Sequence, residues 1–194
     1  MAGENVDRDN HRFDEWSETY ERSFMQWLVF NNAHRSLLSR LPKGFTPTYI
    51  LDIGCGTGRL LRRMQARWPD ADLVGLDPSA GMAIRARQLT RGATIYQASA
   101  EHIPLGDASQ DLVTTTMSFH HWADQAQGVQ EIARVLRVGG LLALADTNIG
   151  HGHPLSRRQV RYLCIACGLA IQSQSSVVPF LSITVGRKSD IYSG

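Results

Sequence analysis

The sequence predicts an α/β protein whose doubly wound, mostly parallel sheet has seven strands and helices on both faces. The first observation is that five strand-like segments alternate with helix-like segments between residues 49 and 145. The second is the glycine-rich stretch ILDIGCGTGRL at residues 50–60, which joins the first strand to a helix. The third is a tail in which only Pro179 and Phe180 separate two strand-like segments.

The N-terminal region reads as a polar arm followed by a helix. Residues 1–12 are charged and show no periodicity, whereas apolar residues recur at helical spacing within Glu18–Leu41. Asn31 and His34 interrupt this apolar stripe. The interruption leaves two interpretations open, a helix that lies over a pocket and a simple surface helix.

The middle of the chain alternates short apolar runs with amphipathic segments. Strands are expected at Tyr49–Ile53, Asp72–Leu76, Thr94–Ala98, Asp111–Met117 and Leu141–Ala145. Helices are expected at Arg59–Trp68, Ser79–Arg91 and Gln125–Leu136. Because such alternation joins parallel strands through right-handed crossovers, we expect an open doubly wound sheet.

The tail of the chain breaks this alternation. One more helix is expected at Leu155–Cys167, followed by strands at Ala170–Val178 and Leu181–Gly186. The two residues between these strands allow a hairpin but no crossover helix. We therefore expect the sheet to end in an antiparallel hairpin.

Composition sets the general class of protein. The 194 residues, 43% of them apolar, suffice for one domain with a sizeable core. A net charge of +2 is too small to indicate a nucleic-acid or acidic-membrane partner. The three cysteines give no disulfide framework, and no signal peptide or membrane span is indicated. We expect a cytoplasmic protein in which Cys164 and Cys167 face the core.

The glycine-rich stretch predicts a ligand site. Gly54, Gly56 and Gly58 follow the first strand, and ligands of open parallel sheets bind at the carboxyl ends of strands. Glycine lets a ligand approach the main chain closely, although a tight turn without a ligand is the alternative. The spacing fits neither the dinucleotide fingerprint nor the phosphate loop of nucleotide hydrolases. It favours a ligand that touches backbone and has no pyrophosphate.

Asp77 ends the second predicted strand, beside the glycine-rich turn. A carboxylate at this place can accept hydrogen bonds from both hydroxyls of a ribose. The alternative is that Asp77-Pro78-Ser79 caps the following helix. Together with the glycines, Asp77 favours a nucleoside without pyrophosphate.

Five motifs of the chain resemble, in order and spacing, those of the class I S-adenosylmethionine-dependent methyltransferases. They are ILDIGCGTGRL, VGLDPS, SAEHIPLGDASQDLV, SFHHWAD and EIARVLRVGGLLALAD, and the resemblance spans roughly residues 13 to 188. It is greatest to the small-molecule subgroup that includes the ubiquinone and menaquinone biosynthesis C-methyltransferases. The resemblance implies the strand order 3-2-1-4-5-7-6 with the last strand antiparallel.

The same resemblance implies the domain plan and the cofactor. Residues 1–194 would form a single methyltransferase domain, with a flexible arm at 1–12 and an N-terminal helical lid at 13–45. The cofactor-binding core would occupy 46–150, and a C-terminal helix and hairpin would occupy 151–194. S-adenosylmethionine would be the cofactor and S-adenosylhomocysteine its product.

The resemblance also transfers to individual cofactor-binding residues. They are Tyr20, Asp52, Gly54, Gly56, Gly58, Asp77, Pro78, Met82, Ser99, Ala100, Glu101 and Ser118. Tyr20 has simple packing as its alternative role. Ser99 stands where the family normally has an aspartate that accepts from the adenine amino group, so this contact departs from the pattern. Val138 replaces the usual proline before Gly139-Gly140, which should alter only the turn.

Histidines follow the fourth predicted strand, where the methyl acceptor is expected. His120 and His121 are the candidate catalytic bases, because the ordinary pKa of histidine, about 6.5, lies close to neutral pH. The alternative is that one of them packs or bonds to a backbone carbonyl. Asp146 is interpreted mainly as a capping acid or an acid that orders the loop. His151 and His153 could complete a metal site with the first pair, but we expect no metal.

Missing sequence features exclude several classes of methyl acceptor. The chain lacks the Asn/Asp-Pro-Pro-Tyr/Phe motif of base and glutamine methyltransferases, a basic stripe and an inserted substrate cap. We expect methyl transfer to an O, N or C atom of a small organic metabolite, with no nucleic-acid partner and no membrane span. The alternatives are a non-catalytic or partner-dependent cofactor-binding subunit and, disfavoured by the glycine spacing, a nicotinamide oxidoreductase. The oligomeric state stays open.

Overall fold

The computed structural model describes residues 24–147, 152 and 154–190, with side chains from residue 30 onward. Its sheet has seven strands in the order β3-β2-β1-β4-β5-β7-β6, which confirms the predicted fold class and strand order. The strands are β1 (Tyr49–Ile53), β2 (Asp72–Asp77), β3 (Ala93–Gln97), β4 (Gln110–Thr116), β5 (Leu136–Thr147), β6 (Leu169–Val178) and β7 (Leu181–Lys188). The helices are α2 (Phe24–Ser39), α3 (Arg59–Arg67), α4 (Ala80–Leu89), α5 (Gln125–Val135), α6 (Arg157–Ala166) and the short 3-10 helix η2 (Phe119–His121).

The direction of the strands follows the predicted plan. The neighbours among β3, β2, β1, β4 and β5 pair in parallel, whereas β7 runs antiparallel to both β5 and β6. The expected arm at residues 1–12 and Tyr20 lie outside the described residues, as does part of the expected lid at 13–45.

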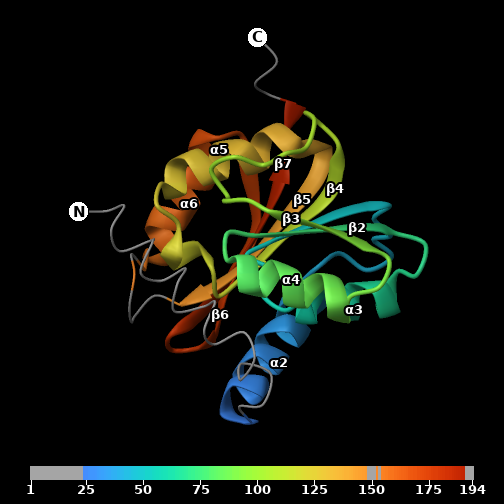
Figure 1. Ribbon diagram of the computed structural model, residues 1–194. Coiled ribbons are helices and arrows are strands. Elements are labelled where there is room, and N and C mark those ends of the chain that lie inside the picture. Colours follow the sequence, from blue (N-terminus) through green and yellow to red (C-terminus); the bar gives the residue numbers. More distant parts are fainter. Residues whose placement is uncertain (1–23, 148–151, 153, 191–194) are drawn as a thin grey trace.

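Two buried layers lie on the two faces of the sheet. Ile50 and Leu51 are neighbours on β1, and their side chains point to opposite faces because side chains alternate along a strand. The Ile50 layer includes Leu61 of α3 and residues of α2 and α4, and the Leu51 layer includes Ile132 of α5 and residues of α6. Figure 1 shows α3 and α4 on one side of the sheet and α5 and α6 on the other.

The polar ends of the helices explain where several of them begin. The hydroxyl of Ser79 accepts a hydrogen bond from Met82 N at 3.1 Å and caps α4, and Asp124 caps α5 in the same way. Ser156 and Gln159 form a reciprocal capping box at the start of α6. In contrast, α3 begins after Gly58 without a side-chain cap, so its first N–H groups face the glycine loop.

The start of β5 differs from the sequence prediction. The strand was expected at Leu141–Ala145 after a Gly139-Gly140 turn, but it begins at Leu136, directly after α5. Leu136 pairs with Gln110 of β4, and a register shift follows before Leu112. Gly139 takes a φ of +80° within the strand, so the pair of glycines bends the strand instead of separating two elements.

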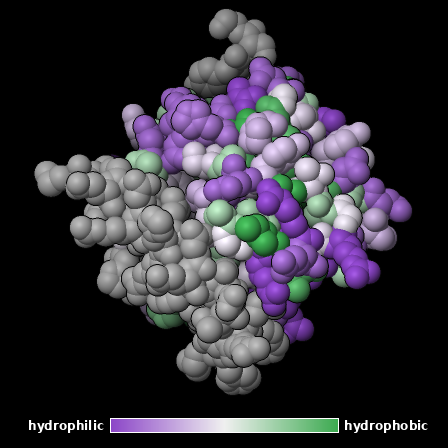
Figure 2. Space-filling view, viewed as in Figure 1, coloured by the Kyte–Doolittle hydropathy of each residue, from purple (hydrophilic) through white to green (hydrophobic). Residues whose placement is uncertain are grey.

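The surface is mostly hydrophilic on the face that Figure 2 shows, where hydrophobic residues occur in small separate patches. Among the helices of the described part of the chain, none is long and apolar enough to cross a membrane. Cys164 is fully buried and Cys167 half-buried, as expected for core-facing residues of α6 and its C-terminal end.

Candidate functional site

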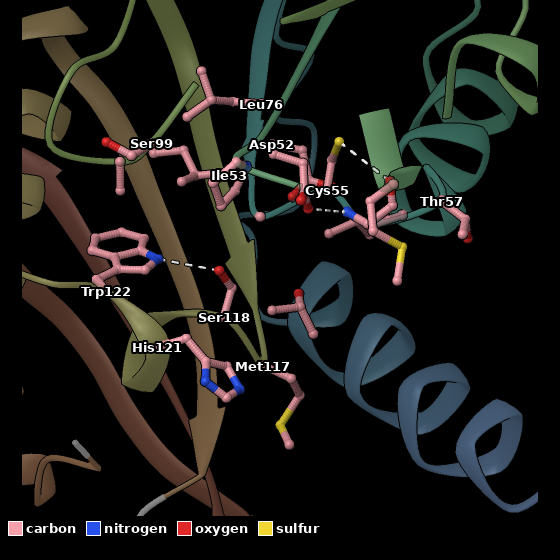
Figure 3. Close-up of a pocket in the computed structure, with 18 of the residues that line it drawn as sticks. Asp52, Ile53, Cys55, Thr57, Leu76, Ser99, Met117, Ser118, His121 and Trp122 are labelled. Atoms are coloured by element: carbon pink, nitrogen blue, oxygen red, sulfur yellow. Dashed lines mark hydrogen bonds between the residues drawn. The ribbon is translucent and has the colours of Figure 1, made fainter. Parts of the chain in front are cut away.

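A cavity of about 340 Å³ opens at the carboxyl ends of β1, β2 and β4. Figure 3 shows residues of the β1 loop on one side of it and residues of the loop after β4 on the other. The predicted cofactor residues that line it are Asp52, Gly54, Gly56, Asp77, Pro78, Met82, Ser99, Ala100, Glu101 and Ser118. Gly58 does not line the cavity, and Tyr20 lies outside the described residues.

The three glycines of the β1 loop all have positive φ, but they serve different purposes. A Cβ atom on Gly54 would overlap the side chain of Ser118, and one on Gly58 would overlap the hydroxyl of Thr90 at the end of α4. A Cβ atom on Gly56 would meet nothing within 4 Å. Gly54 and Gly58 therefore allow close packing, and Gly56 is the one of the three at which a side chain would project into open space.

Asp77 joins the glycine loop to the start of α4. Its Oδ2 accepts a hydrogen bond from Gly56 N at 2.8 Å, and its Oδ1 accepts one from Ser79 N at 3.0 Å. Ser79, not Asp77, caps α4. Asp77 also lines the cavity, so its carboxylate lies beside the space where a ligand would bind.

Asp52 is a second carboxylate in the cavity wall. It is 2% exposed, and its Oδ1 accepts a hydrogen bond from Thr114 Oγ1 at 2.7 Å. Burial is the main reason why the pKa of Asp52 is raised to about 7; the nearby charge of Asp77 acts in the same direction, and the Thr114 hydrogen bond opposes the shift. A positively charged ligand would stabilise the ionised form of Asp52.

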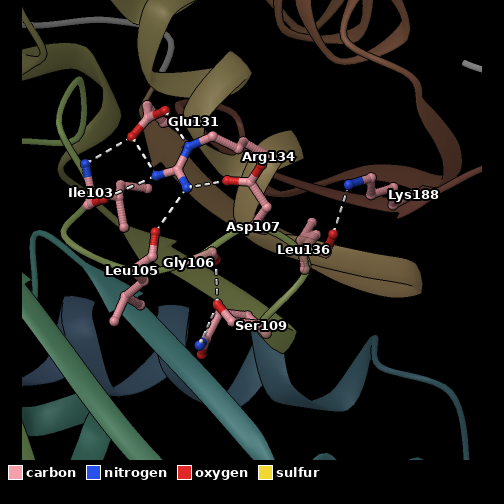
Figure 4. A network of polar contacts seen from close by, with 10 residues as sticks. Ile103, Leu105, Gly106, Asp107, Ser109, Glu131, Arg134, Leu136 and Lys188 are labelled. Atoms are coloured by element: carbon pink, nitrogen blue, oxygen red, sulfur yellow. Dashed lines mark hydrogen bonds and ion pairs between the residues drawn. The ribbon is translucent and has the colours of Figure 1, made fainter. Parts of the chain in front are cut away.

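The loop between β3 and β4, residues 98–109, is held by a network around Arg134 of α5 (Figure 4). The guanidinium donates to both carboxylate oxygens of Glu131 at 2.7 and 2.8 Å and to the carbonyls of Ile103 and Leu105. Glu131 in turn accepts from Ile103 N at 2.9 Å. This network fixes the backbone that follows Ser99, Ala100 and Glu101.

The two candidate histidines point to different surroundings. His121 lines the cavity, whereas His120 is buried and does not line it. Asp146 at the end of β5 holds His120 twice, since Oδ2 accepts from His120 N at 2.7 Å and Oδ1 lies 2.6 Å from His120 Nδ1. The rings of His120 and His121 lie 4.0 Å apart. Asp146 thus orders the loop, as the sequence suggested.

The loop after β4 also contains features that sequence reasoning missed. Met117 lines the cavity with a φ of +53°, a strained conformation for a residue other than glycine. Trp122 Nε1 donates to Ser118 Oγ at 3.1 Å and thereby fixes the hydroxyl that lies against Gly54 (Figure 3). Trp122 stood in the SFHHWAD motif, but no local pattern indicated the backbone of Met117.

The metal alternative has no support among the residues described. No group of three or more His, Cys, Asp or Glu side chains in that part of the chain is arranged to hold a metal ion. His151 and His153 themselves lie outside the described residues.

The chain is similar to known methyltransferases. Residues 51–144 match the family described as "Methyltransferase domain". Malonyl-[acyl-carrier protein] O-methyltransferase of Dechloromonas aromatica is 40% identical over 142 residues, which cover 71% of this chain and 52% of that protein. Trans-aconitate 2-methyltransferase of Afipia carboxidovorans is 33% identical over 124 residues, which cover 61% and 47%. The chain therefore spans about half the length of these curated relatives.

The fold is shared with a solved structure. An S-adenosylmethionine-dependent methyltransferase from Aquifex aeolicus superposes with a TM-score of 0.69 and 17% identity, over 80% of this chain and 89% of that one. The family match, the relatives, and the sheet order of the structure agree with one another. Residues 51–144 therefore form a domain that matches the methyltransferase domain family.

Proposed function

We propose that the chain transfers a methyl group from S-adenosylmethionine to an O, N or C atom of a small organic metabolite. The observation that carries this proposal is the pairing of Gly56 with Asp77. Gly56 leaves open space at the cavity, and its N–H is bonded to the carboxylate of Asp77, which also lines the cavity. A nucleoside that touches backbone and presents a ribose suits this arrangement.

The lining residues fit the parts of this cofactor. Asp77 would hold the ribose, and Met82, Ser99 and Ala100 would surround the adenine, since they lie on the segments that follow β2 and β3. Asp52 would face the positively charged part of the molecule, which suits a buried carboxylate. When bound, the cofactor supplies an activated methyl group on a positively charged sulfur.

The acceptor side of the cavity would orient the second substrate and receive a proton. His121 lines this side, next to Met117 and Ser118, and would act as base where the acceptor needs one. His120 would act as a positioning residue, because Asp146 fixes its ring and backbone beside His121. The N-terminal lid proposed for residues 13–45, of which α2 is the described helix, would exclude water from the site.

The relatives narrow the first acceptors to test. The names of the two curated relatives refer to malonyl-[acyl-carrier protein] and trans-aconitate, and both acceptors carry carboxyl groups. Small carboxylic acids are therefore the first compounds to offer the chain, together with a pool of other metabolites.

Calorimetry with S-adenosylmethionine and S-adenosylhomocysteine tests the cofactor part of the proposal. We expect both compounds to bind. Asp77→Ala should weaken the binding of both, because the hydroxyls of the ribose lose the carboxylate that accepts their hydrogen bonds. Asp72→Ala is the matched control, since Asp72 is an exposed carboxylate at the opposite end of β2. Failure of both compounds to bind at millimolar concentration would contradict the proposal.

Transfer of labelled methyl groups tests the catalytic part. The purified chain, a labelled donor and a pool of carboxylic acids and other small metabolites should give a labelled product. Tight cofactor binding without any transfer by the chain alone would instead favour the partner-dependent binding subunit.

A further inference from the structure

A groove of about 490 Å³ lies beside the cofactor cavity, between α2 and α3. Helix α3 contributes Arg59, Arg62 and Arg63 to it, and α2 contributes Phe30, Asn31 and His34. Phe30, His34 and Arg59 also line the cavity, so the two spaces adjoin. No residue that lines the groove within the described part of the chain is acidic.

We propose that this arginine groove binds a carboxylate group of the methyl acceptor, while the atom to be methylated lies in the adjoining cavity. The proposal rests on the proposed methyl transfer and adds the class of acceptor, an anionic carboxylic acid. Arginine is suited to this task because its planar guanidinium can bind a carboxylate through two parallel hydrogen bonds.

The spacing of the arginines brings them to one face of α3. Positions i, i+3 and i+4 of a helix are neighbours on its surface, so Arg59, Arg62 and Arg63 present their charges together. Like charges at this spacing repel one another, and a bound anion would relieve the repulsion. The groove therefore presents three guanidinium groups from one helix face to an anionic ligand.

Hydrogen bonds to the protein anchor two of these guanidinium groups. Arg62 Nη1 donates to the carbonyl of Thr57 at 2.7 Å, which ties it to the glycine loop. Arg63 Nη2 donates to Asn31 Oδ1 across the groove. A guanidinium has five N–H donors, so the bond to Asn31 positions Arg63 and still allows it to donate to a carboxylate.

The titration of nearby groups is consistent with a positive potential. His34 is buried, and its pKa is lowered to about 3, first by burial and then by the charges of Arg63 and Arg59. Burial and the charge of Arg35 also lower the pKa of Arg63. At neutral pH His34 is therefore a neutral hydrogen-bonding group among cations.

The cofactor also has a carboxylate, in its amino-acid tail, and this group could bind the arginines in place of the carboxylate of the acceptor. Arg59 lines both spaces, so a ligand confined to the cavity can reach it. Arg62 and Arg63 line the groove and not the cavity. A ligand that contacts Arg62 and Arg63 must extend into the groove, which favours the acceptor.

Malonate provides the probe, with uncharged malonamide of similar shape as its control. Each is titrated calorimetrically into the chain, first alone and then saturated with S-adenosylhomocysteine, at constant ionic strength. We expect malonate and not malonamide to bind in both titrations. Arg62→Gln and Arg63→Gln should each weaken malonate binding by about ten-fold or more, the usual effect of losing a charge-assisted hydrogen bond.

Three further variants make the comparison specific. Arg161→Gln removes an exposed arginine of α6 and should leave malonate binding unchanged. Arg63→Lys keeps the charge without the planar fork and should retain part of the affinity. If Arg63→Gln unfolds at lower temperature than the other variants, Arg62→Gln and Arg63→Lys still test the groove.

Several outcomes would overturn the inference. Equal binding of malonate by the wild type and both glutamine variants would do so, as would equal binding of malonamide. The glutamine variants could instead lose affinity for S-adenosylhomocysteine but not for 5′-methylthioadenosine, which lacks the amino-acid tail. That result would assign the groove to the cofactor. The titrations without cofactor keep this result separate, because failure of S-adenosylhomocysteine to bind contradicts the proposed function and not the groove.

Discussion

Gly54 of the β1 loop lies so close to Ser118 that a Cβ atom on the glycine would overlap the serine side chain. The loop that follows β1 and the loop that follows β4 are therefore in direct contact, and the hydrogen bond from Trp122 Nε1 to Ser118 Oγ keeps the serine in place. This contact joins the side of the cavity proposed for the cofactor to the side proposed for the methyl acceptor.

Gly54→Ala should destabilise the fold more than Gly56→Ala. Both substitutions force an alanine into a left-handed conformation, which costs about 1–2 kcal/mol, but only Gly54→Ala also brings a methyl group into collision with Ser118. Thermal unfolding measures the difference. The double variant Gly54→Ala with Ser118→Gly should recover part of the loss, and no recovery would mean that the collision is not its cause.

Gly56→Ala should weaken cofactor binding beyond its effect on stability. The added methyl group would occupy space at the cavity, where Gly56 meets no protein atom. Gly44→Ala is the matched control, because Gly44 has a φ of +77° and equally open surroundings but does not line the cavity. Calorimetry with S-adenosylhomocysteine that shows equal affinities for both variants would count against a ligand on this backbone.

Asp52→Asn should make the ligand-free protein more stable at pH 8 than the wild type. The folded pKa of Asp52, about 7, exceeds the unfolded value of about 3.9, so the folded state retains a proton that the unfolded state releases. The unfolding free energy attributable to Asp52 thus falls as pH rises from about 4 to 7, by at most about 1.4 kcal/mol per pH unit. Denaturant titrations at pH 4 and pH 8 should show the advantage of the variant only at the higher pH.

Cofactor binding should release protons near pH 7. A cationic ligand favours the ionised form of Asp52, so binding lowers its pKa and affinity declines as pH falls below about 7. Calorimetric enthalpies of S-adenosylmethionine binding should therefore depend on the ionisation enthalpy of the buffer. Asp52→Asn should lose this buffer dependence, and its persistence in the variant would assign the proton to another group.

Arg134→Gln should weaken cofactor binding through the loop at residues 98–109. The variant loses the hydrogen bonds to Ile103 O and Leu105 O, at an expected cost on the order of 1 kcal/mol because the side chain is partly exposed. Hydrogen exchange at residues 98–106 should accelerate. Arg158→Gln, which replaces an exposed arginine of α6, should change neither exchange nor affinity.

His121→Ala and His120→Ala should fail in different ways. His121 lines the cavity, so its loss should lower kcat while the melting temperature stays nearly constant. His120→Ala leaves the buried Asp146 without its ring partner and should cost about 1–3 kcal/mol of stability. Identical rate and stability effects in both variants would contradict these separate roles.

The sequence was sufficient for elements whose boundaries are set locally. Residues Tyr49–Ile53 and the hairpin around Pro179-Phe180 were predicted from runs of apolar residues and turn residues, and both are present. The predicted start of β5 was wrong because Leu136 pairs with Gln110. This contact between distant segments outweighs the local preference of Gly139-Gly140 for a turn. The pattern of residues along one segment cannot show which distant strand pairs with that segment.

The site shows the same division between local and distant information. Motif spacing placed Asp77 at a strand end beside the turn that contains Gly56, and the structure joins the two by a hydrogen bond. Spacing could not separate the packing role of Gly54 from the exposed backbone of Gly56, nor reveal that the ring of His120 turns toward Asp146. These properties depend on neighbours that are remote along the chain.

The hydrogen bond between Gly56 N and Asp77 Oδ2 has a consequence for the kinetics of binding. Asp77 orders the glycine loop in the ligand-free protein, so the loop loses its conformational freedom during folding and not during association. The half of the site proposed for the cofactor is thus preorganised, and its backbone should show equal order with and without ligand. Differences in residence time among cofactor analogues should then reflect their own contacts and not the rearrangement of this loop.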